Sequence, residues 1–318
     1  MNSIAVMGAG AVGGFYGAIL AQAGRPVAFI ARGAHLAALR RDGLTVEREG
    51  QPAITLREIV ATDDPAHVGP VDLVLFTPKV FDLDDTAERI KPLVSGGTLV
   101  LPLLNGLDTA DRLAAVIGRD HVLAGVCHIS STVAAPGLIR QVGPLNRIVL
   151  GEMEGGASRR AAEVAELLKA AGINAATSER MPEELWKKFY FLDPWASVCA
   201  LTAAPLGAVR EDPDTRAVLV ACIEEVRALA AARRVPLPTV SEALATLDGL
   251  PHGTTPSLLR ALEQGARLEI EAFQGTALRL GRDLGVPTPV HSLIYAALKL
   301  RAAGRQSQGP ISGSRADG

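Results

Sequence analysis

Three glycines near the start of the chain have the spacing of a phosphate-binding turn. The segment Gly8-Ala9-Gly10-Ala11-Val12-Gly13 follows a short apolar run and precedes a stretch with helical character. In a strand–turn–helix unit, Gly8 allows the tight turn, Gly10 lets the backbone approach a pyrophosphate, and Gly13 lets the helix pack closely on the sheet. The helix N-terminus offers free N–H groups and a partial positive charge to the phosphates. The segment therefore predicts a dinucleotide-binding site.

The residue after the second apolar run indicates which dinucleotide binds. Sites for NAD usually carry Asp or Glu there, to hold the ribose 2′-hydroxyl. In this chain the position is Arg32, and the first acidic residue, Asp42, lies too far along. A planar guanidinium suits the 2′-phosphate of NADP because it donates paired hydrogen bonds. We expect NADP rather than NAD; the alternative is a solvated surface arginine.

Two lysines in Trp186-Lys187-Lys188-Phe189 could supply a proton. A lysine that faces a cleft in these aromatic surroundings would be partly desolvated, and its lowered pKa would suit proton donation. The alternative is a solvated pair on an amphipathic helix, which composition alone favours.

Glu269, Glu271 and Ser257 are further candidates. Helical positions two apart point about 200° apart, so at most one of the two glutamates faces the interior. A turn at Gly265 could bring Ser257 close to Glu269. The alternative for Ser257 is a helix N-cap after Pro256.

The six histidines show no metal-ligand spacing and no pairing with cysteine or carboxylate side chains. We expect surface or packed histidines and no metal site.

The first half of the chain alternates between strands and helices. Apolar runs predict strands over residues 4–7, 27–30, 71–76, 98–104 and 122–126, and helices over 15–23, 33–42, 82–94 and 108–117. This rhythm predicts an N-terminal Rossmann-type, doubly wound α/β sheet. Residues 44–48 and 53–57 form a predicted hairpin, and residues 137–142 and 147–151 form a second one at an edge. A helix over 158–171 and a strand over 173–177 complete this half.

The second half is predicted to be all-helical. Helices are expected over residues 182–192, 214–233, 240–247, 257–263, 268–284 and 289–303. We place an NADP-binding domain at 1–178, a helical substrate and catalytic domain at 179–303, and a disordered tail at 304–318.

Composition narrows the function classes. The chain has 318 residues, 48% of them hydrophobic, and a net charge of −2, so no electrostatic field attracts nucleic acid or an anionic membrane. No apolar run reaches about 18 residues, which argues against a membrane span. Cys127, Cys199 and Cys222 are expected to be buried free thiols, and the protein to be cytoplasmic. The alanine-rich helices leave a homodimer open.

Taken together, these motifs resemble the ketopantoate reductase (2-dehydropantoate 2-reductase) family over nearly the whole length apart from the tail. The matching segments are the glycine turn with Arg32, Thr77-Pro78-Lys79, Asn105-Gly106, Leu185-Trp186-Lys187-Lys188-Phe189, Pro205-Leu206-Gly207, Ser257, and Glu269-Ile270-Glu271 followed by Gly275.

The resemblance implies roles for individual residues. Lys188 matches the proton-donating lysine, Asn105 the asparagine near nicotinamide and substrate, and Ser257 a substrate-binding residue. Glu269 matches the acidic residue at the nicotinamide end of the cleft.

On the cofactor side, the resemblance pairs Arg32 with Lys79 at the 2′-phosphate. It also shows departures from the family pattern. Leu192 and Ala196 occupy substrate-contacting positions where relatives commonly have asparagine, and so does Leu206 before Gly207. The substrate pocket is therefore expected to be more apolar than in the common pattern.

The resemblance implies NADPH-dependent reduction of the small 2-oxo acid 2-dehydropantoate in pantothenate biosynthesis. A reductase of another, more apolar 2-oxo acid is the first alternative. A catalytically silent NADPH-binding sensor is the second.

Overall fold

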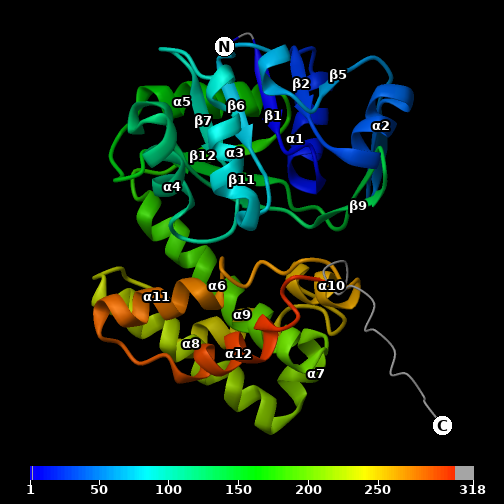
Figure 1. The fold of residues 1–318 in the computed structure, drawn as a ribbon. Coiled ribbons are helices and arrows are strands. Elements are labelled where there is room, and N and C mark those ends of the chain that lie inside the picture. Colours follow the sequence, from blue (N-terminus) through cyan, green and yellow to red (C-terminus); the bar gives the residue numbers. More distant parts are fainter. Residues whose placement is uncertain (2, 305–318) are drawn as a thin grey trace, which may run out of the picture. The chain divides into compact units, whose positions relative to one another are not determined.

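The computed structural model describes residues 1 and 3–304, which fall into two compact units. The first comprises Met1–Leu185 and the second begins at Trp186. Every strand of the described chain lies in the first unit, whereas residues 186–304 are helical with connecting turns (Figure 1). This arrangement confirms the predicted fold class.

A five-stranded parallel sheet forms the centre of the first unit. Its strand order is β5-β2-β1-β6-β7, and every neighbouring pair runs parallel. The strands are short, and all but the edge strand β5 are largely buried, as expected of a parallel sheet covered on both faces. Their bounds are β1 (Ile4–Met7), β2 (Val27–Ile30), β5 (Val60–Thr62), β6 (Leu73–Phe76) and β7 (Leu99–Pro102).

A helix follows each of four of these strands: α1 (Ala11–Gln22) after β1, α2 (Gly33–Asp42) after β2, α3 (Leu83–Arg89) after β6 and α4 (Thr109–Ile117) after β7. Helix α1 begins directly after the glycine turn, earlier than the predicted residue 15, because Gly13 and Gly14 are already helical and buried. The single helix predicted over 82–94 is shorter, because Pro92 lies in a separate 3₁₀ turn, η3 (Lys91–Leu93).

A second, four-stranded sheet packs on the other side of α1. Its order is β4-β3-β10-β9, and α1 contacts strands of both sheets. The hairpin of β3 (Leu44–Arg48) with β4 (Gln51–Leu56) agrees with the prediction. Strands β9 (Ser131–Ala135) and β10 (Leu138–Gln141) form a second hairpin, and β10 also pairs parallel with β3.

The hairpin predicted between residues 137–142 and 147–151 is wrong. Strand β11 (Arg147–Gly151) pairs instead with β8 (Ala124–His128) and β12 (Asn174–Thr177) in a third sheet. Helix α5 (Arg159–Ala170) packs on this sheet and begins at the expected N-cap, where the Ser158 hydroxyl accepts from the Ala161 N–H.

The second unit is built from helices, the first of which starts at the end of the first unit. They are α6 (Met181–Thr202), α7 (Leu206–Glu211), α8 (Pro213–Ala232), α9 (Val240–Asp248), α10 (Ser257–Glu263), α11 (Gln274–Leu284) and α12 (Pro289–Lys299). Helix α6 continues ten residues beyond its predicted end at residue 192 and contains Pro194. The turns around that proline are buried, so packing offsets the lost backbone hydrogen bond.

Two further differences concern α7, which was not predicted, and α11, which begins at Gln274 rather than at 268. The predicted boundary at residues 178 and 179 falls between β12 and α6, and the domain limits stay a prediction. Residues 305–318 of the predicted tail lie outside the described residues.

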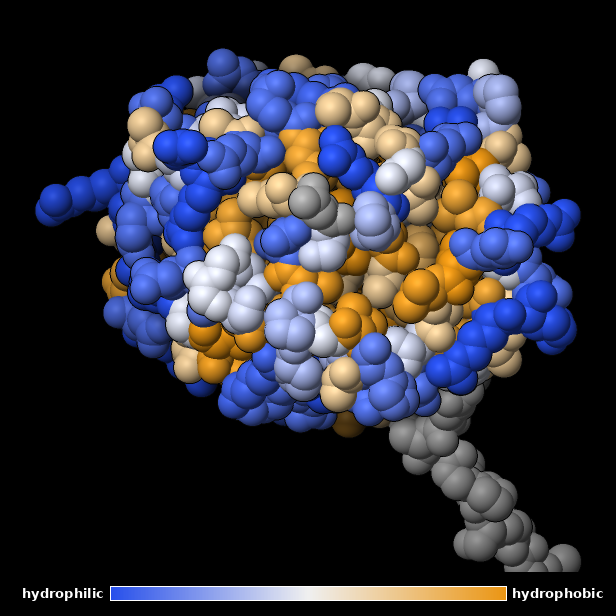
Figure 2. Space-filling model, turned by 90° about the horizontal axis from the view of Figure 1, so that it is seen from above, coloured by the Kyte–Doolittle hydropathy of each residue, from blue (hydrophilic) through white to orange (hydrophobic). Residues whose placement is uncertain are grey.

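The three cysteines are free and buried. Among the described residues, no helix has the length and apolar character needed to cross a bilayer. On the face drawn in Figure 2, apolar residues lie in the middle and hydrophilic ones dominate the rim.

Candidate active site

The glycine turn of the first unit is closely packed against the end of β6. A Cβ atom on Gly13 would lie 2.2 Å from Thr77 Oγ1 and 2.5 Å from the Gly8 carbonyl oxygen. Gly8 has φ +97°, and a Cβ there would lie 2.9 Å from the backbone of Thr77. The Thr77 hydroxyl donates to the Gly8 carbonyl oxygen at 2.8 Å. Packing therefore requires glycine at both positions. The Thr77 hydroxyl, for which the sequence alone indicated no separate role, holds the glycine turn through its hydrogen bond to Gly8.

Gly10 has a different environment. A Cβ on Gly10 would meet nothing within 4 Å, so the space beside it is open. Gly10 is also the N-cap of α1, which starts at Ala11. Because glycine has no side chain, it makes no capping hydrogen bond to the N–H groups of the first helical turn. The turn therefore has open space next to N–H groups that no side chain caps. Such a place suits a pyrophosphate group.

Arg32 lies at the end of β2 and is the N-cap of α2. Its guanidinium is ion-paired with the Asp82 carboxylate at 2.6 Å, and the two side chains are 65% and 25% exposed. Asp82 and the exposed Lys79 belong to the segment that follows β6. The structure thus places Arg32 and the Lys79 segment after the two strands that flank β1, and it adds Asp82, which sequence reasoning missed.

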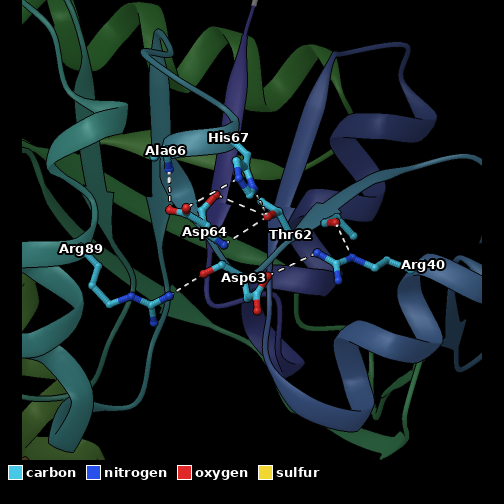
Figure 3. A network of polar contacts seen from close by, with 8 residues as sticks. Arg40, Thr62, Asp63, Asp64, Ala66, His67 and Arg89 are labelled. Atoms are coloured by element: carbon cyan, nitrogen blue, oxygen red, sulfur yellow. Dashed lines mark hydrogen bonds and ion pairs between the residues drawn. The ribbon is translucent and has the colours of Figure 1, made fainter.

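A polar network holds α2 and α3 over the end of β5 (Figure 3). Arg40 of α2 donates to the Ala61 carbonyl oxygen at 3.1 Å and to the Asp63 carboxylate at 3.3 Å. Arg89 of α3 donates to the Asp63 carbonyl oxygen. Arg40 and Arg89 thus tie the C-terminal ends of α2 and α3 to the residues at the end of β5.

Asn105 follows β7, three residues after the strand ends at Pro102. It is half-buried, and the next residue, Gly106, has φ +102°. Carboxyl ends of parallel strands are where ligands bind in doubly wound sheets. Asn105 is therefore in the right kind of place for its predicted role, which stays a prediction.

In the second unit, Lys188 lies in the first half of α6 and is half-buried. Leu192, one turn later, is half-buried too, whereas Ala196 is 1% exposed. Leu206, at the start of α7, is fully buried. Of these three apolar departures, only Leu192 has appreciable exposed surface.

Glu269 lies in the turn that precedes α11, not on a helix as predicted. It is 9% exposed, whereas Glu271 points outward and accepts hydrogen bonds from Arg279 at 2.9 Å and from the Tyr295 hydroxyl at 2.6 Å. One glutamate is thus buried and one solvated, as expected. Ser257 is the first residue of α10 and Pro256 is the N-cap, so the N-cap alternative for Ser257 is wrong.

A buried polar cluster in the same unit was not predicted. His291 of α12 lies with Nε2 2.7 Å from Asp193 of α6 and with Nδ1 2.5 Å from Glu225 of α8. Ser197 donates to Asp193 at 3.0 Å and accepts from Gln274 of α11 at 2.6 Å. The expectation that no histidine pairs with a carboxylate is wrong, because the partners lie 98 and 66 residues away.

The cluster keeps its histidine charged. Burial alone would lower the pKa of His291, but Asp193 and Glu225 outweigh it and raise this pKa to about 9. Burial acts to raise the pKa of the Glu225 carboxyl. The hydrogen bonds that it accepts from His291 and Val290 outweigh this effect and hold its pKa below the usual value. The imidazolium therefore joins α6, α8 and α12. Within the described residues, no group of three or more histidine, cysteine or acidic side chains could hold a metal ion.

Comparison with known proteins gives full-length matches. Two family models match: "Ketopantoate reductase PanE/ApbA" over residues 4–155 and "Ketopantoate reductase PanE/ApbA C terminal" over residues 180–302. A 2-dehydropantoate 2-reductase from Mesorhizobium japonicum is 30% identical over 95% of this chain and 98% of its own.

Solved structures agree with this. A PanE/ApbA family ketopantoate reductase from Ralstonia eutropha JMP134 is 32% identical, covers 94% of this chain and 98% of its own, and has a TM-score of 0.87. A D-mandelate dehydrogenase with NADH and anilino(oxo)acetate is 23% identical, covers 94% of this chain and 98% of its own, and has a TM-score of 0.85. The second likeness is one of fold.

Proposed function

This chain belongs to the ketopantoate reductase PanE/ApbA family of NAD(P)-dependent oxidoreductases, and from that premise we propose that it reduces 2-dehydropantoate to pantoate with NADPH, a step of pantothenate biosynthesis. The observation that carries the proposal is the similarity to a 2-dehydropantoate 2-reductase over 95% of the chain. The proposed substrate is thus a small 2-oxo acid.

The choice of NADPH rests on Arg32 and Lys79. An exposed ion pair such as Arg32–Asp82 contributes only about 0–1 kcal/mol. A 2′-phosphate can therefore replace Asp82 as the partner of Arg32, with Lys79 as the second cation. Residues 8–13 would hold the pyrophosphate through the start of α1.

The chemistry divides between cofactor and protein. A bound reduced nicotinamide supplies the hydride. Lys188, as an ammonium, stabilises the negative charge that develops on the carbonyl oxygen of the substrate and then donates a proton to it. Asn105 orients the carbonyl group, Ser257 binds the polar end of the substrate, and Glu269 orients Lys188 or the product hydroxyl.

A second candidate is reduction of a more apolar 2-oxo acid. Leu192, Ala196 and Leu206 stand where the family resemblance places asparagines. Leu192, which keeps exposed surface, would offer a substrate an apolar contact in place of an amide. The D-mandelate dehydrogenase of similar fold holds NADH and anilino(oxo)acetate, which carries an aromatic group. The alternative without catalysis is an NADPH-binding sensor, which would bind the dinucleotide tightly and reduce no substrate.

One assay separates the candidates. Purified protein is given a panel of 2-oxo acids with side chains of increasing apolar size, with NADPH and NADH side by side, and loss of nicotinamide absorbance is followed. The proposal predicts the highest kcat/KM for 2-dehydropantoate with NADPH. A higher value for a bulkier acid favours the second candidate, and no turnover with tight NADPH binding favours the sensor.

A further inference from the structure

His35 contacts the phosphate-binding turn directly. It projects from the first turn of α2, and its Nε2 lies 2.8 Å from the carbonyl oxygen of Ala9, between Gly8 and Gly10. Its Nδ1 lies 3.1 Å from the backbone nitrogen of Gly137. The ring therefore bridges the glycine turn and the turn between β9 and β10.

These two contacts fix the protonation state of the ring. The Gly137 N–H can only donate, so Nδ1 must accept and carries no proton. The Ala9 carbonyl can only accept, so Nε2 must carry the proton. His35 is thus neutral when both bonds are made. A second proton on the ring would sit on Nδ1. Two N–H donors would then face each other, and the hydrogen bond from Gly137 would be lost.

The partner turn has little freedom to move away. Gly137 has φ +79°, and a Cβ there would lie 3.2 Å from Ala38 Cβ, so the turn packs tightly on α2. In the next strand, Ile139 Cδ1 would lie 2.2 Å from a Cβ on Gly14 of α1. The second sheet thus packs closely against α1 and α2, and the His35 ring links it to the glycine turn.

No other ionisable group in these segments would confuse a titration of this ring. Residues 8–22 contain Tyr16 as their only titratable side chain, and it is buried. Residues 129–139 contain none, and the next, Arg140, is paired with Glu47 at 2.7 Å. On α2 itself, Arg40 is paired with Asp63 and Arg41 with Asp42, and Arg32, the N-cap residue, is paired with Asp82. Burial lowers the pKa of His35 below its usual value, in keeping with a neutral ring.

We propose that His35 is a positioning residue for cofactor binding: as a neutral imidazole it ties Ala9 to Gly137 and holds the glycine turn in the form that accepts a pyrophosphate. This rests on the proposed function only in that a dinucleotide binds at this turn. Protonation of the ring loosens the turn, so affinity falls as the pH falls below the usual histidine range.

The test measures the dissociation constant of NADH by nicotinamide fluorescence from about pH 5 to pH 8. NADH is chosen because the 2′-phosphate of NADPH titrates near pH 6 and would add its own step. The variant His35→Gln has no titratable ring, and its single amide cannot reach both partners. His67→Gln, an exposed histidine of the same unit, is the matched control.

We expect the wild type and the His67→Gln variant to lose affinity as the pH falls below about 6.5. His35→Gln should bind NADH about 3- to 10-fold more weakly at pH 8, the effect of one or two lost hydrogen bonds, and show no such pH step. An unchanged pH step in His35→Gln overturns the role, and a lowered Tm with an unchanged step identifies a merely structural ring.

A second measurement needs no variant. The ¹⁵N signals of the His35 ring in the full-length wild type report its tautomer and pKa, with and without NADH. Because the neutral ring favours binding, NADH should lower this pKa, and a pKa that rises or stays constant overturns the proposal. Failure of the wild type to bind either dinucleotide would instead overturn the proposed function together with this role.

Discussion

The guanidinium of Arg32 lies 2.6 Å from the carboxylate of Asp82. The pair joins the end of β2 to the segment after β6, on either side of the glycine turn that follows β1. Asp82 is also the N-cap residue of α3, yet its side chain caps nothing there. Its carboxylate instead neutralises the arginine proposed to select NADP.

Replacement of Arg32 by alanine tests that selection. Arg32→Ala should weaken NADPH binding about 10- to 100-fold, the effect of charge-assisted hydrogen bonds, and NADH binding far less. Dissociation constants of both dinucleotides measured at one ionic strength check this. Equal losses for both would show that Arg32 does not bind the 2′-phosphate.

Replacement of Asp82 by asparagine should act in the opposite direction. Asp82→Asn removes the competing charge, so NADPH should bind about 2- to 5-fold more tightly while NADH changes little. The ratio of the two dissociation constants is the readout, with Asp248→Asn as a control because Asp248 pairs with Arg216 of the second unit instead. Weaker NADPH binding in Asp82→Asn would mean that the carboxylate orients Arg32 rather than competing for it.

Two of the glycines that lie in open space separate an effect on folding from an effect on binding. A methyl group on Gly10 meets nothing within 4 Å, so Gly10→Ala should keep the wild-type Tm but bind NADPH about tenfold or more weakly, because the pyrophosphate loses its close approach. Gly96→Ala, also in open space, should change neither quantity. Unchanged NADPH affinity in Gly10→Ala would argue that no pyrophosphate lies there.

The buried imidazolium predicts how stability depends on pH. Since the pKa of His291 is about 9 in the folded protein and near 6.5 when unfolded, its contribution is complete below pH 6.5 and lost as the pH rises through 9. The difference amounts to roughly 3 kcal/mol. Tm should fall over this range in the wild type. In His291→Gln it should be lower at pH 6 and fall less steeply, and an equal slope in both would contradict the assignment.

Lys188 has a matched control beside it. Lys188→Ala should lower kcat about 10²- to 10⁴-fold and leave the NADPH dissociation constant nearly unchanged, because only the proton donor is lost. Lys187→Ala, on the same helix, should keep kcat within about threefold of the wild type. Equal turnover in the Lys188 variant would exclude it as the proton donor.

Local signals predicted much of the first unit. The glycine turn, β1, β2 and α2 have sequence patterns that depend only on neighbouring residues, and their bounds agree closely with the structure. Strand partners depend on distant residues, which is why β10 and β11 were paired with each other although they lie in different sheets.

The same distinction applies to the candidate site. The cluster around His291 joins residues from four helices, and no spacing rule connects them. Glu269 was expected to be on a helix because its apolar neighbours have helical spacing, but Phe273 has φ −111° and ψ −97° and helix α11 starts only after it. The contact between His35 and Ala9 forms only because α2 folds back beside the turn.

The most direct test is the steady-state oxidation of NADPH by 2-dehydropantoate, measured for the wild type and the Lys188→Ala variant in the same preparation series. The account predicts rapid oxidation by the wild type, faster with NADPH than with NADH, and a loss of about 10²-fold or more in the variant. NADPH that binds but is not oxidised by 2-dehydropantoate or by any other 2-oxo acid would contradict it.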